Sequence, residues 1–119
     1  MSVKANEALR AARNQALYRE VNEKIQELNA AFAEVATLSG TWVCECADQR
    51  CAEAIEMTLA EYEAIRMHPN RFAVLPGHVV GTVERVVEAR DAYVVVEKLG
   101  PAAAYAIEHD PRREERLTA

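Results

Sequence analysis

The sequence predicts an α+β fold in which a long N-terminal amphipathic helix is followed by a small, mostly antiparallel sheet with one short helix. Two observations lead to this fold class. Apolar residues recur every three or four positions along residues 18–35, and short β-branched and aromatic runs separated by turn residues fill residues 41–99. A length of 119 residues, half of them apolar, is typical of a single globular unit. We expect three parts: the helix over 1–38, a small α+β domain over 39–100, and a C-terminal tail over 101–119 that is partly disordered.

The predicted N-terminal helix ends before Ser39 and Gly40. Its apolar positions follow steps of three and four, which keep them on one side of the helix: Tyr18, Val21, Ile25, Leu28, Phe32 and Val35. A helix of about 30 residues would be about 45 Å long, more than a small core can cover. We therefore expect the helix to project and to bind a protein partner or a second copy of the chain, in the latter case as a coiled coil. Packing of the apolar stripe on its own domain is the alternative.

Residues 41–58 are expected to form a β-hairpin. The run TWVCECA (41–47) has the composition of a strand, and AEAIEMT (52–58) alternates like a half-exposed return strand, so that the turn between them carries Cys51. Thr58 and Glu61 have the spacing of a capping box, which predicts a short helix over 59–67 that ends before Pro69.

Three further strands complete the predicted sheet. RFAVL (71–75) is stopped by Pro76 and Gly77, whereas the runs 83–89 and 93–99 form an antiparallel hairpin joined at Arg90 and Asp91. We expect Trp42, Tyr62 and Phe72 to fill the core. We expect Arg66 and Arg71 to form surface ion pairs worth less than about 1 kcal/mol.

The charge balance argues against nucleic acid as a partner. Nineteen acidic and 14 basic residues give a formal charge of −5, whereas binding to phosphate backbones relies on a concentrated positive field. No apolar run of about 18 residues is present to span a bilayer, and the N-terminus MSVKANEALR lacks the apolar core of a secretory signal. We therefore expect a cytoplasmic protein, and in a reducing compartment three cysteines indicate metal binding or thiol chemistry in place of disulfides.

The three cysteines form a C-x-C-x4-C pattern within eight positions. Cys44 and Cys46 are two apart on a predicted strand and project from the same face, so they can share one ion. The hairpin turn brings Cys51 back as a third thiolate, and a tetrahedral site needs one more ligand. We choose His78, because a histidine directly after a Pro-Gly turn can be held rigidly.

Other fourth ligands and other roles remain open. Asp48 and Glu45 are the weaker candidates for the fourth position, and water would leave the site open. Reactive thiols and plain packing of small buried side chains are the competing roles of the cysteines. No C-x-x-C pair is present, and we find no signal that places one of these cysteines at a helix N-terminus, the two features that favour thiol catalysis.

Zinc is the metal that we expect. It suits thiolate with imidazole, although three cysteines and one histidine can also hold an iron–sulfur cluster. Three thiolates make zinc a poor Lewis acid, which favours a structural ion in a zinc-ribbon-like hairpin over a catalytic one. The function that we expect is a non-enzymatic zinc-binding interaction or regulatory module whose N-terminal helix engages a partner. A thiol- or metal-responsive redox sensor is the alternative, and a small catalytic zinc or iron–sulfur protein comes third.

Several segments together resemble a family of short bacterial proteins to which no function is assigned. The resemblance covers residues 17–98 and is carried by REVNEKIQELN, CECADQRC, MTLAEYEAIR, RFAVLPGH and VERVVEARDAYVVVEK. It implies that Cys44, Cys46, Cys51 and His78 belong to the family pattern. An acidic residue often follows the Pro-Gly-His triplet in that pattern, whereas Val79 stands there in this chain. The resemblance implies no enzyme activity.

Overall fold

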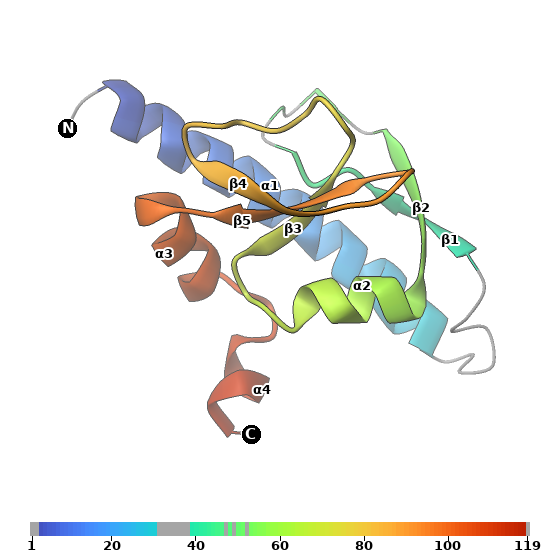
Figure 1. The fold of residues 1–119 in the computed structure, drawn as a ribbon. Helices are drawn as coiled ribbons and strands as arrows, with labels where there is room; N and C mark the ends of the chain where they lie inside the picture. Colours follow the sequence, from blue (N-terminus) through green and yellow to red (C-terminus); the bar gives the residue numbers. More distant parts are fainter. Residues whose placement is uncertain (1–2, 31–38, 47, 49, 52, 119) are drawn as a thin grey trace.

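The computed structural model describes residues 3–30, 39–46, 48, 50, 51 and 53–118 (Figure 1). In chain order the elements are α1 (Val3–Ala30), β1 (Ser39–Val43), β2 (Ala54–Thr58), α2 (Leu59–Arg66), β3 (Arg71–Val74), β4 (Glu84–Ala89), β5 (Val94–Lys98), α3 (Gly100–Glu108) and α4 (Arg113–Thr118). The predicted fold class is confirmed: a long N-terminal helix comes before antiparallel strands and a short helix. No helix in the described part of the chain is long and apolar enough to cross a membrane.

The strands form two small antiparallel sheets where the sequence suggested one. β1 and β2 make a two-stranded sheet, and the other strands make a three-stranded sheet in the order β3-β5-β4. β2 continues directly into α2, which carries the chain away from the first hairpin before β3 begins. One backbone hydrogen bond of 2.9 Å, from the Glu45 N–H to the Ala73 carbonyl, joins the end of the first hairpin to β3.

The start of α2 has the predicted capping box. The Thr58 hydroxyl accepts a hydrogen bond from the Glu61 N–H at 3.0 Å, and the Glu61 carboxylate accepts one from the Thr58 N–H at 2.9 Å. One turn further on, the Tyr62 ring stacks on Trp42 with a centroid distance of 4.2 Å. The aromatic core that the sequence predicted is therefore present, with Trp42, Tyr62 and Phe72 all buried.

Helix α1 lies against the rest of the molecule along its polar side. It crosses behind the two sheets (Figure 1) and packs on α3, β1 and α2. The buried face carries Gln15, Arg19, Asn22 and Glu23. On the predicted apolar stripe Leu28 is 72% exposed, whereas Ile25 is half-buried and packs against the core.

The expectation of a projecting helix is therefore wrong for this part of α1. The physical reason is that its buried polar groups find hydrogen-bonding and charged partners in other elements. The stripe residues Phe32 and Val35 lie outside the described residues.

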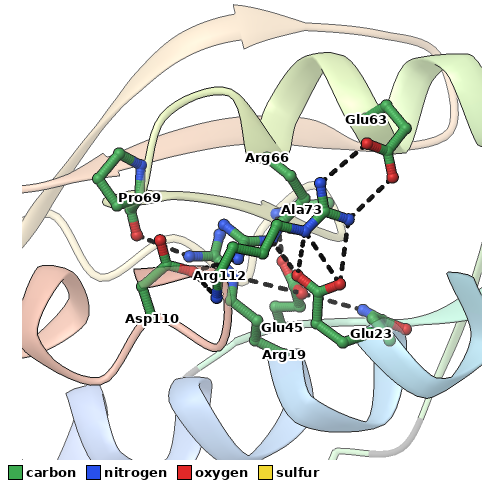
Figure 2. Close-up of polar contacts among 10 residues, drawn as sticks. Arg19, Glu23, Glu45, Glu63, Arg66, Pro69, Ala73, Asp110 and Arg112 are labelled. Atoms are coloured by element: carbon green, nitrogen blue, oxygen red, sulfur yellow. Dashed lines mark hydrogen bonds and ion pairs between the residues drawn. The ribbon is translucent and has the colours of Figure 1, made fainter. Parts of the chain in front are cut away.

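The C-terminal segment, expected to be partly disordered, forms α3 and α4. Ala102 and Ala106 of α3 are buried, and the loop after α3 buries Asp110. Side chains of that loop reach α1 and α2: the Arg112 guanidinium donates hydrogen bonds of 2.8 to 3.1 Å to the carboxylates of Glu23 and Glu63 (Figure 2). The chain end is therefore tied to both helices by charge.

Arg66 is a buried member of this charged cluster, which corrects the prediction of a surface pair. Its side chain is fully buried and bonds Asp110 and, at 2.6 Å, Glu23. Burial alone would lower the pKa of Arg66, but the hydrogen bonds and charges of Asp110 and Glu23 outweigh it and raise the pKa. Arg71, by contrast, forms the expected partly exposed pair, at 3.1 Å from Glu97.

Candidate metal centre

The three cysteines lie in the loop that connects β1 to β2. Cys44 follows β1 directly, and its N–H donates a 2.9 Å hydrogen bond to the Glu53 carbonyl, which continues the hairpin pairing past Val43. The Cys51 N–H donates to the Asp48 carbonyl at 2.9 Å and closes the turn. These bonds place all three sulfurs near one another, as the spacing predicted, and none of the three cysteines is in a disulfide.

His78 reaches the cysteines through the turn after β3. The His78 N–H donates to the Leu75 carbonyl at 3.0 Å, and Gly77 between them has a φ of +88°. Pro76 then Gly77 suits the two central positions of a type II turn, the second of which needs a positive φ. The Leu75 N–H donates to the Cys44 sulfur at 3.2 Å. One turn therefore positions the imidazole and also supplies a hydrogen bond to a thiolate.

The four donor groups are close enough to share one ion. Ligand atoms of Cys44, Cys46, Cys51 and His78 all lie within 4.8 Å of one another. The His78 Nδ1 atom is 3.6 Å from the Cys44 sulfur and 3.7 Å from the Cys51 sulfur. Zinc bonds of about 2.3 Å to sulfur and about 2.05 Å to nitrogen, at a tetrahedral angle, separate the two donors by about 3.6 Å. The residues present therefore fit a tetrahedral ion of this size.

The weaker candidates for the fourth ligand are not in the cluster. Glu45 points to the opposite side of the segment and is fully buried among α1 and β3, although β1 ends at Val43 and residues 44–46 lie beyond it, not on the predicted strand. The Asp48 carboxylate accepts a hydrogen bond from the Arg50 N–H at 2.9 Å and is exposed. Neither belongs to the group of ligand atoms that lie within bonding reach of one ion.

Glu53 is a residue of the site that the sequence reasoning missed. One of its carboxylate oxygens lies 3.5 Å from His78 Nε2, the ring nitrogen that faces away from the sulfurs. A carboxylate near the second ring nitrogen of a metal-ligating histidine is a common partner that orients the ring. Glu53 comes from the loop just before β2. Its position two residues after Cys51 was the available signal.

The thiols of Cys44 and Cys46 are buried, and burial opposes their ionisation. It raises the pKa of the Cys44 and Cys46 thiols above the ordinary value, although backbone hydrogen bonds from Leu75 and at Asp48 oppose the shift. A metal that binds here must therefore displace protons. At Cys44 and Cys46 the site therefore favours the neutral thiol until an ion compensates the charge of the thiolate.

Comparisons with models of protein families, with curated proteins and with solved structures give no match to this chain. The resemblance to a family of short bacterial proteins therefore stays a prediction. Any statement on function has to come from the geometry of the chain itself.

Proposed function

We propose that the protein is a non-enzymatic zinc-binding interaction or regulatory module, with a structural zinc held by Cys44, Cys46, Cys51 and His78. The observation that carries the proposal is the convergence of three sulfurs and one imidazole nitrogen within 4.8 Å. The ligands come from two separate turns, so an ion ties the first hairpin to the end of β3. A structural zinc contributes about 10–16 kcal/mol to folding, as much as the net stability of a typical domain.

The distances support a single ion over an iron–sulfur cluster. A two-iron cluster distributes its ligands over two metals, which separates donors on different irons more widely than donors around one ion. All four donor atoms here lie within 4.8 Å of one another, the closer arrangement that a single ion requires. Four protein ligands also complete a tetrahedron and leave no position for a reacting water, which favours a structural over a catalytic ion.

The outer side of α1 supports an interaction role. Leu17 is 60% exposed, Val21 44% and Leu28 72%, and the three lie on one side of the helix. We propose that this side engages a protein partner or a second copy of the chain. Light scattering after size-exclusion chromatography tests self-association: a dimer that Leu17→Ser with Leu28→Ser converts to a monomer supports it, and a monomeric wild type leaves only a different partner.

Thiol-based redox sensing is the second candidate. The closeness of the three sulfurs favours it, because hydrogen peroxide, with two protons from solvent, could oxidise two thiolates to a disulfide, with two water molecules as the other product and release of the ion. Reversible zinc release at low peroxide doses supports this function. A site that keeps its ion until the protein unfolds speaks against it. We place either module in the cytoplasm, where a reducing environment keeps such thiols available.

Elemental analysis of the purified protein tests the metal proposal. We expect one zinc per chain, and a tetrahedral thiolate spectrum after substitution with Co²⁺. His78→Ala removes a proposed ligand, whereas His68→Ala removes an exposed histidine outside the cluster and serves as the control. A wild-type protein without zinc, or equal metal content in the two variants, contradicts the proposed site. A coloured protein that contains iron shows that the site holds an iron–sulfur cluster and not zinc.

A further inference from the structure

The segment Val43–Cys46 faces two ways. Its cysteine sulfurs point into the proposed metal site, and the Glu45 side chain between them points into the interior and is fully buried. One Glu45 carboxylate oxygen accepts a 3.0 Å hydrogen bond from the Ala73 N–H, and the other lies 3.8 Å from the Arg19 guanidinium of α1 (Figure 2). A shift of the metal-binding backbone would therefore move a buried charge away from its partners.

Asn22 of α1 holds the same segment by its backbone. Its amide nitrogen donates to the Val43 carbonyl at 2.9 Å and to Glu45 at 3.1 Å, and its amide oxygen accepts from the Val43 N–H at 2.9 Å. The side chain thus pairs with β1 as a neighbouring strand would. One turn earlier on α1, the Tyr18 hydroxyl donates to the Asp48 carbonyl at 3.1 Å, inside the cysteine loop.

These contacts join the cysteine loop to α1. The Asn22 amide fixes Val43 and Glu45, the residues that flank the ligand Cys44. Conversely, α1 keeps these polar partners only while the loop holds its shape. Buried polar groups that lose their partners destabilise the arrangement strongly, so intermediate positions are unfavourable. When two binding events favour the same conformation of one segment, each strengthens the other by the same factor. The two events here are metal binding and docking of α1.

We propose that metal binding at the cysteine loop and docking of α1 are thermodynamically linked through Asn22 and Glu45, so that the metal controls how firmly the helix is held. The inference rests on the proposed zinc site and adds its regulation. Asn22 is a positioning residue: it lies outside the ligand set and acts on the ligands through the backbone at Val43. Metal binding would thereby affect the docking of α1, the helix that carries the exposed apolar side.

A comparison of two buried amides on α1 tests the linkage. Asn22→Ala removes the contacts to the metal loop, whereas Gln15→Ala, two turns away on the same face, removes a 3.1 Å hydrogen bond to Glu84 in the three-stranded sheet. Zinc affinity is measured on the full chain by competition with a chelator. We expect Asn22→Ala to weaken zinc binding about 5–150-fold, the usual range of coupling between sites. Gln15→Ala should change it no more than about twofold, the scatter of independent sites.

Hydrogen exchange on the wild type supplies a second measurement that needs no variant. Zinc should slow amide exchange in residues 14–28, because linkage is reciprocal: if docking of α1 strengthens zinc binding, zinc strengthens docking of α1. Equal zinc affinities of the two variants, or helix exchange that zinc leaves unchanged in a protein that binds it, overturns the linkage and leaves the zinc site intact. A wild type that binds no zinc overturns the proposed function itself, which separates the two failures.

Discussion

Replacing Arg66 by Met distinguishes a buried charge cluster from the surface pair that the sequence suggested. The Arg66 and Asp110 side chains are 0% and 1% exposed, and Glu23 is 10% exposed. Removing the cation leaves buried carboxylates, a change that typically costs about 3–5 kcal/mol. Glu23 keeps its hydrogen bonds to Arg112, so we expect the lower end, about 3 kcal/mol, of this range. A surface pair would cost less than about 1 kcal/mol.

Urea unfolding followed by circular dichroism, at one fixed zinc concentration, measures the difference. With a slope of about 1–3 kcal/mol/M, a loss of about 3 kcal/mol lowers the midpoint by at least about 1 M. The control is Arg85→Met: Arg85 bonds Glu97 at 3.0 Å, but its side chain is 64% exposed. Similar small shifts of the urea midpoint for both variants would refute the reasoning, because they would show that burial does not increase the stabilising contribution of the Arg66 ion pairs.

Three further results are expected. Glu53→Gln should lower zinc affinity about 10–100-fold in the chelator competition, because it removes the charge behind the imidazole; an unchanged affinity would mean that the carboxylate does not orient the ring. Gly77→Ala should destabilise the protein by about 1–2 kcal/mol in urea unfolding. The cause is the positive φ of Gly77 alone, since an added Cβ meets nothing within 4 Å. The control is Gly81→Ala, which is equally open and has no positive φ, and which should be neutral or stabilising. Tyr93 donates a 2.7 Å hydrogen bond to Glu61, and this bond is the main cause that lowers the pKa of that carboxyl. Tyr93→Phe should raise the pKa of Glu61, measured by NMR titration. The stability that this hydrogen bond contributes should be present at pH values above the pKa of Glu61 in the unfolded chain. It should disappear as the pH falls through the lower pKa of Glu61 in the folded protein.

Elements specified by neighbouring residues could be predicted. The capping box of Thr58 and Glu61, the two hairpins and the turn before His78 each depend on side chains a few positions apart, so their spacing in the sequence is already their spacing in the fold. The proposed ligand set was predictable for the same reason. Three of its members are local, and the fourth directly follows a Pro-Gly turn.

The orientation of α1 could not be predicted in this way. An apolar stripe indicates a buried face only when the opposite, polar face has no partners better than water. Here Gln15 bonds a carboxylate 69 residues away in the chain, and Glu23 bonds Arg112 at a separation of 89 residues. The pattern of residues within the helix gives no information on partners so distant in the sequence. For the same reason Arg66 resembled a surface residue.

By itself, the sequence determined the fold class, the short elements between residues 54 and 98 and the chemical character of the cysteine cluster, because local backbone preferences and the donor atoms of cysteine and histidine do not depend on distant partners. Only the tertiary structure decided which face of α1 is buried, that Glu53 stands behind His78, and that Glu45 and Asn22 join the cysteine loop to the helix. Those outcomes depend on pairing charges and hydrogen bonds across the whole fold, and such pairs exist only after the distant segments have met.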